Sequence, residues 1–258
     1  MPSRNSSLAR GLEPFISGLW IFFVLASLLV AAVWAFGIGE GSLERSISNT
    51  DLRVTLAWLL THMDLAWITL AAANVYLALT RSVGLDTARR WGLITLGGVV
   101  AMAWLSAVTG FPLGPIRYGT PLGLKLGPVP LGLALLWFTI ILSARETVLR
   151  FFPRVPQGGL AAGVGLVALL TDLNLESVAA KWRGFWFWRG GGPTEPPVFD
   201  APLTSHFAWG ILAILVTFFL RESNVVSTAQ KRLWQPTATL AIFEGILLLT
   251  NVTHRLSH

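Results

Sequence analysis

The stretch Ile16–Phe36, ISGLWIFFVLASLLVAAVWAF, contains no charged residue along its whole length. A helix needs roughly 20 apolar residues to cross the hydrocarbon core of a bilayer, so this stretch predicts a transmembrane helix. Arg4 and Arg10 precede it, as basic residues precede the apolar core of a signal peptide. The apolar run is longer than such a core and no good cleavage site follows, so we expect an uncleaved anchor.

The rest of the chain has the same apolar character. Of its 258 residues, 53% are hydrophobic and only 12% are charged, which excludes an ordinary soluble domain. The sequence predicts an all-α fold, a polytopic integral membrane helical bundle that forms one domain over residues 1–258 with about seven transmembrane helices. The candidate spans are 16–36, 54–80, 91–109, 126–145, 158–173, 202–220 and 236–252.

The net charge and the absence of cysteine exclude some functions. The formal net charge is +6, but the basic residues are scattered between apolar segments, so we expect no nucleic-acid partner. The chain has no cysteine, which excludes disulfides, thiolate metal ligands and a cysteine nucleophile.

The positive-inside rule favours a cytoplasmic N-terminus in an inner (cytoplasmic) membrane. The N-terminal segment and the loops after the second, fourth and sixth spans carry most of the cations. These are Arg4, Arg10, Arg81, Arg89, Arg90, Arg145, Arg150, Arg154, Arg221, Lys231 and Arg232. The loops on the other side are longer and richer in Gly, Pro and Trp, and we expect the working site toward that outer side.

Three acids lie inside or at the edge of the predicted spans: Asp64, Asp172 and Glu244. A charged acid in hydrocarbon is costly, so such residues face a cavity, pair with another group or stay protonated. Asp172 and Glu176 are four residues apart and share one helical face if the helix continues that far. Two carboxylates so close in a dry site cannot both ionise at low cost, which suits a proton donor. The alternative is a solvated helix end neutralised by Lys181 or Arg183.

Other polar and aromatic residues leave alternatives open. Asp64 and Glu244 could each serve as a proton donor or simply form hydrogen bonds with neighbouring helices. No metal-binding spacing of histidines is present, although a pair made by His62 and His206 is conceivable at the outer ends of two spans. The tryptophans in KWRGFWFW could wall an apolar slot and stabilise a cation. The remaining expectation is an interfacial belt formed by Trp20, Trp34, Trp91 and Trp234.

The segment TGFPLGPIRYGTPLGLKLGPVPLGLALLWF, from Thr109 to Phe138, carries a recognisable pattern. It resembles the carotenoid biosynthesis membrane protein family that includes the CruF-type ψ-end (1,2-) carotenoid hydratases. A second matching stretch contains Asp172, Glu176, Val178, Ala179, Trp186 and Trp188, and a third contains Pro202, Leu203, Ala208 and Trp209. Three positions depart from the family pattern, namely Ser177, Ser205 and the neighbourhood of Ala103.

The resemblance implies a substrate and a reaction. The substrate is an acyclic C40 or C50 carotenoid, and the reaction is addition of water to a terminal double bond without any cofactor. Protonation of that double bond gives a tertiary carbocation, which water then captures. The partners that we expect are this carotenoid and the lipid bilayer, in a homo-oligomer or a pigment–protein complex.

The resulting hypothesis assigns roles to individual residues. Asp172 and Glu176 are the expected proton-delivering pair, with Asp64 or Glu244 as an assisting acid. The expected substrate-binding residues are Thr109, Tyr118, Asn174, Trp186, Trp188, His206 and Trp209. Two rival hypotheses remain, namely protonation followed by ring closure, as in a carotenoid cyclase, and a non-catalytic carotenoid-binding subunit of a pigment–protein complex.

Overall fold

The protein is a bundle of membrane-length helices in a computed structural model that describes residues 5–38, 48–188, 201–221 and 233–256. Among these described residues, six helices are long and apolar enough to cross a membrane, and the shorter apolar helix α7 is the seventh. The helices are α1 (Asn5–Ala35), α3 (Thr50–Val83), α4 (Leu85–Thr109), α5 (Leu131–Phe151), α6 (Gln157–Glu176), α7 (Leu203–Phe219) and α9 (Gln235–Leu256). The predicted membrane bundle of about seven helices is thereby confirmed.

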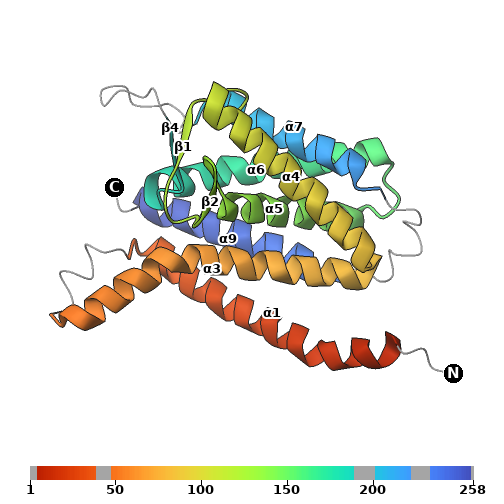
Figure 1. The fold of residues 1–258 in the computed structure, drawn as a ribbon, viewed down its shortest axis with the longest axis horizontal. Coiled ribbons are helices and arrows are strands. Elements are labelled where there is room, and N and C mark those ends of the chain that lie inside the picture. Colours follow the sequence, from red (N-terminus) through yellow and green to blue (C-terminus); the bar gives the residue numbers. More distant parts are fainter. Residues whose placement is uncertain (1–4, 39–47, 189–200, 222–232, 257–258) are drawn as a thin grey trace.

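Two short antiparallel ribbons and one π-helix complete the regular secondary structure of the described residues. The ribbons pair β1 (Ile116–Tyr118) with β4 (Trp186–Trp188) and β2 (Lys125–Leu126) with β3 (Val129–Pro130). The π-helix η1 (Ser177–Trp182) continues directly from α6. Figure 1 shows the ribbons at one end of the bundle, the end where the chain also finishes.

Helix α5 lies at the centre of the bundle, between α3, α4, α6 and α9 (Figure 1). Most of its side chains are buried, whereas α1 presents large apolar side chains to its surroundings, such as Phe22 and Leu28. In a soluble protein such a surface would drive aggregation, but in a bilayer it faces lipid.

Several helix boundaries differ from the expected ones for local reasons. α3 begins at Thr50 because Asn49 caps it, with Oδ1 accepting a hydrogen bond from Leu52 N at 3.0 Å. α5 begins at Leu131 rather than at residue 126, because the apolar segment before it forms the β2–β3 ribbon. α6 does not stop at residue 173 but reaches Glu176, so Asp172 and Glu176 lie in one continuous helix.

The expected tryptophan belt is wrong for two of its four members. Trp34 and Trp91 are buried, with 2% and 0% of their surface exposed. The Trp91 ring lies under the guanidinium of Arg145, 4.0 Å from ring centroid to Cζ, and that guanidinium also pairs with Glu146 at 2.7 Å. Buried polar groups need such partners, and here a ring and a carboxylate supply them.

Two glycines set the distance between α6 and α7. A Cβ added to Gly165 would lie 2.4 Å from the side chain of Ile214 and 2.9 Å from the carbonyl oxygen of Gly210. A Cβ on Gly210 would lie 3.2 Å from the carbonyl oxygen of Gly165. Small residues at a contact let helix backbones approach closely in membranes, and this contact holds α6 against α7.

We expect Gly165→Ala to lower the thermal unfolding temperature of the purified protein in detergent, because overpacking a tight contact costs about 1–3 kcal/mol. Gly158 lies in the first turn of the same helix with no atom within 4 Å of an added Cβ, so Gly158→Ala is the matched control. It should leave the unfolding temperature unchanged or raise it, since alanine favours the helix. Equal effects of both variants would contradict the proposed contact.

Candidate active site

The β1–β4 ribbon has one buried face and one exposed face. Tyr118 stands opposite Trp186, and Ile116 stands opposite Trp188. Side chains alternate between the faces of a strand, so these four share the face that is turned into the bundle. The exposed face carries Arg117 opposite Phe187. The ribbon therefore places two indole rings and one phenol at the end of α6.

Close backbone packing fixes the position of this ribbon. A Cβ on Gly119 would lie only 1.9 Å from the carbonyl oxygen of Gly184, so only glycine fits there. Gly184 itself has a φ of +59°, which favours glycine and turns the chain from η1 into β4. Gly119 N then donates to the carbonyl oxygen of Phe185 at 2.8 Å.

Glu176 is held by the two indole rings of the ribbon. Its carboxyl accepts hydrogen bonds from Trp186 Nε1 at 3.1 Å and from Trp188 Nε1 at 2.6 Å. Only 3% of Glu176 is exposed. The wider turn of η1 returns the chain so that residues ten and twelve positions later reach the carboxyl, and such π-helical turns are frequent at functional sites.

One turn earlier on α6, Asp172 contacts His206 of α7. Asp172 Oδ2 and His206 Nδ1 lie 2.6 Å apart, and both residues are buried. The other oxygen, Asp172 Oδ1, has no hydrogen-bond partner among the described residues. Asp172 and His206 also interact electrostatically with Glu176, so the three groups form one cluster. We refer to Asp172, Glu176 and His206 as the acid cluster.

Two further buried hydroxyl groups lie on α7 and on the β1–β4 ribbon. Ser205 precedes His206 on α7 and is 1% exposed, and Tyr118 lies opposite Trp186. Neither Ser205 Oγ nor Tyr118 Oη has a hydrogen-bond partner within the part of the chain that the structure describes. Burial raises the pKa of the Tyr118 phenol above its ordinary value, so this group stays neutral and can donate.

Asp64 occupies a different position, in an ion pair. Arg183 donates to Asp64 Oδ2 from Nη2 at 2.6 Å and from Nε at 2.9 Å, and Trp34 Nε1 donates to Oδ1 at 3.0 Å. The carboxylate is completely buried. This network ties α1 and α3 to the segment after η1, and it means that Arg183 neutralises Asp64 rather than the acids at the end of α6.

Glu244 lies against the other face of α6. It accepts hydrogen bonds from Thr171 Oγ1 and from Asn174 Nδ2, the latter at 3.0 Å. Asn251 Nδ2 in turn donates to the carbonyl oxygen of Asn174 at 2.8 Å. Glu244 and Asn174 therefore bind α9 to α6, and the structure brings neither of them to the acid cluster.

The remaining candidate residues lie in separate environments. Thr109 is exposed, and its hydroxyl donates to the carbonyl oxygen of Leu105 at 2.7 Å and accepts from Phe111 N at 3.1 Å, so it stabilises the turn that follows α4. Trp209 stacks on Trp137 of α5 with ring centroids 3.9 Å apart.

The two histidines of the considered metal pair do not meet. His62 is exposed on α3 and stacks on Trp58, whereas His206 is buried beside Asp172. No group of three metal-ligating side chains comes together in the described ranges of the chain.

Sequence reasoning missed three contributors to these networks. The sequence singles out Ser205 only as a departure from the family pattern and Trp137 only as part of a motif. Arg183 was considered as a partner for the acids at the end of α6, yet its partner Asp64 is 119 residues away in the sequence. The available signal was an arginine within an aromatic run, because a cation among buried rings favours an acid as its partner.

Comparison with known proteins gives one match. The family model described as "Carotenoid biosynthesis protein" matches residues 63–257, which is well over half of the chain. The matched residues include the acid cluster, the β1–β4 ribbon and every described helix from the middle of α3 onward. Neither the curated proteins nor the solved structures yield a match to this chain. The protein belongs to the carotenoid biosynthesis protein family and is a multi-pass membrane protein.

Proposed function

We propose that this protein is a carotenoid hydratase that adds water to the terminal double bond of an acyclic C40 or C50 carotenoid. The observation that carries the proposal is the acid cluster. It combines two buried carboxyl groups with an imidazole, and two indole N–H groups donate to it from the ribbon. No guanidinium contacts Asp172 or Glu176 among the described residues. Hydration of an alkene requires an acid that can donate a proton away from bulk water. A buried carboxyl group of the acid cluster can serve as this acid.

Glu176 is the proposed proton donor. Two carboxylates beside one imidazolium would leave a net negative charge in a dry environment, which favours an additional proton in the acid cluster. When Glu176 gives that proton to the substrate, the indole N–H groups of Trp186 and Trp188 are already aimed at the resulting carboxylate. Such preorganised donors stabilise charge that develops during a reaction.

The proton goes to the less substituted carbon of the terminal double bond. A new C–H bond forms, the π bond breaks, and the positive charge remains on the tertiary carbon. The faces of electron-rich indole rings stabilise a nearby cation, and Trp186 and Trp188 are the proposed walls of this part of the site. Trp137 and Trp209 stack on each other between α5 and α7 and have no role in this step.

Water then attacks the tertiary carbon and forms a C–O bond. Ser205 Oγ, Tyr118 Oη and Asp172 Oδ1 are the buried polar atoms proposed to hold this water, because each of them lacks a partner within the described residues. The Asp172–His206 pair accepts the proton that the water loses, and its return to Glu176 restores the starting state. The sum is one alkene plus one water giving one tertiary alcohol, without any cofactor.

Asp64 and Glu244 have supporting roles in this proposal. Arg183 keeps Asp64 as a paired carboxylate, which is a poor proton donor. Glu244 lies on the α9 face of α6, away from the face that carries Asp172, and it holds two helices together. The proposed chemistry therefore needs only the acid cluster, the indoles of Trp186 and Trp188, and the hydroxyl groups of Ser205 and Tyr118.

The direct test is incubation of membranes containing the intact protein with lycopene or with an acyclic C50 carotenoid. The expected product is heavier than the substrate by one water molecule and carries the label when the assay is run in heavy-oxygen water. An isomeric product that contains a new ring would instead indicate proton transfer followed by ring closure. A carotenoid that copurifies with the protein and is never converted would indicate a binding subunit.

Replacing either carboxyl should abolish turnover while preserving the fold. We expect Asp172→Asn and Glu176→Gln each to lower the rate of alcohol formation about 100-fold or more, the usual contribution of an acid or base group. Asp86→Asn removes an exposed acid from the first turn of α4 and should keep the wild-type rate. Thermal unfolding in detergent checks the fold, and wild-type rates in both cluster variants would reassign the proton donor.

Removing the Ser205 hydroxyl should change what becomes of the carbocation rather than how fast it forms. One hydrogen bond contributes about 1 kcal/mol, so Ser205→Ala should lower the ratio of alcohol to isomeric alkene about fivefold. Ser143 on α5 is equally buried and its hydroxyl also lacks a partner among the described residues, so Ser143→Ala is the matched control. An unchanged product ratio in Ser205→Ala would remove Ser205 from the water site.

A further inference from the structure

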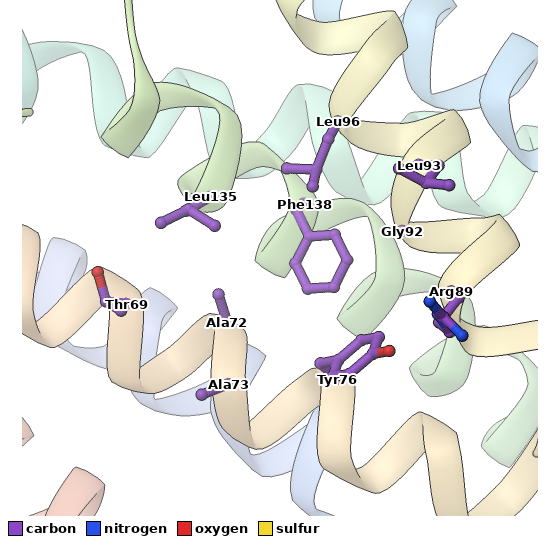
Figure 2. A pocket seen from close by; sticks show the side chains of 10 residues that line it. All are labelled: Thr69, Ala72, Ala73, Tyr76, Arg89, Gly92, Leu93, Leu96, Leu135 and Phe138. Carbon is purple, nitrogen blue, oxygen red and sulfur yellow. The ribbon is translucent and has the colours of Figure 1, made fainter. Parts of the chain in front are cut away.

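A groove runs between α3 and α4, and two residues of α5 complete its lining. Figure 2 shows its lining, with Thr69, Ala72, Ala73 and Tyr76 from α3, Arg89, Gly92, Leu93 and Leu96 from α4, and Leu135 and Phe138 from α5. The groove has a volume of about 460 Å³. Its residues do not overlap with the acid cluster.

Small side chains create this space. Ala72 and Ala73 line the α3 wall, and Gly92 lies on the α4 wall, where an added Cβ would already be 3.5 Å from the Phe138 ring. Large apolar side chains lie on either side, including Leu93 at 73% exposure. Apolar walls around an open trough in a membrane protein suit a hydrocarbon chain.

The polar end of the groove lies toward the ends of the two helices. Arg89 is four residues after the start of α4, and Tyr76 is seven residues before the end of α3. Thr69 and Leu96 are each seven residues deeper, which corresponds to about 10 Å along a helix. The groove therefore extends from the region where both helices leave the membrane toward the middle of the bilayer.

Arg89 is the only charged residue in the lining. It is exposed and has no hydrogen bond or ion pair with the described residues, whereas the adjacent Arg90 donates to the carbonyl oxygen of Arg221 at 3.5 Å. Arg81, in the last turn of α3, adds positive charge at this end of the bundle, and with Asp86 in the first turn of α4 the three arginines of residues 81–90 leave a net charge of +2. A cation over the mouth of an apolar trough complements an anionic head group on an apolar chain.

We propose that this groove binds an anionic phospholipid, with one acyl chain between α3 and α4 and the phosphate on Arg89. A carotenoid, which is a neutral hydrocarbon, would leave the guanidinium without a counter-charge. A zwitterionic lipid would place a second cation beside Arg81 and Arg89. The positive charge at this end of the groove therefore favours an anionic lipid. The lipid site is independent of the proposed hydratase activity.

Native mass spectrometry of the full chain, with phosphatidylglycerol and phosphatidylcholine of equal chain length, tests the proposal. Phosphatidylglycerol should bind about tenfold more tightly, as expected for one charge-assisted phosphate contact. Arg89→Gln should remove this preference, Arg89→Lys should retain most of it, and the neighbouring control Arg90→Gln should keep it. Equal binding of the two lipids, or equal effects of Arg89→Gln and Arg90→Gln, would overturn the proposal.

A second pair of variants tests the position of the acyl chain. Ala73→Phe fills the groove and leaves Arg89 in place, so it should weaken phosphatidylglycerol binding, and glycerol phosphate without acyl chains should not bind detectably. Ala101→Leu enlarges an exposed residue elsewhere on α4 and should have no effect. Undiminished lipid binding by Ala73→Phe, or displacement of the lipid by an acyclic carotenoid, would exclude an acyl-chain site here.

Discussion

The constraint on which this structure depends is that every carboxyl group it buries must find a donor inside the bundle. The fully or almost fully buried acids of the described chain are Asp64, Glu146, Asp172 and Glu176. Each accepts a hydrogen bond from a residue of the protein or pairs with one. Without such partners, the cost of placing four acids in an apolar interior would exceed the stability of a typical protein.

The identity of the donor separates these acids into two kinds. Asp64 and Glu146 pair with the guanidinium groups of Arg183 and Arg145, which remain charged at any relevant pH. Such pairs fix the geometry of neighbouring elements but cannot release a proton. Asp172 and Glu176 meet an imidazole and two indoles, which leave their protonation free to change. The proton transfer that we propose therefore belongs to the end of the bundle where α6, α7 and the β1–β4 ribbon meet.

The helices could be predicted from the sequence because the bilayer imposes a length and a polarity on each of them. The predicted span 126–145 includes all of the β2–β3 ribbon except Lys125, since residues such as Leu126 and Val129 are as apolar as those of a membrane helix. The partners of the buried acids were harder to predict. Asp64 and Arg183 are 119 residues apart, and His206 is 34 residues from Asp172, so only the packing of the helices brings them together. Glu176 and its indoles are ten and twelve residues apart, but the link depends on a π-helical turn that apolar periodicity does not reveal.

The close α6–α7 contact connects the packing of the bundle to the geometry of the acid cluster. Gly165 is about two helical turns from Asp172, and Gly210 is about one turn from His206, so the approach of the two backbones determines whether the 2.6 Å contact between these residues can form. The ribbon is fixed separately, by the approach of Gly119 to Gly184, and it sets the distance from the indoles to Glu176. The two halves of the acid cluster are thus held by glycine contacts that contain no ionisable group. Because hydrogen bonds of this length tolerate little displacement, a small shift of either backbone would separate an acid from its donor and leave a buried carboxyl unpaired.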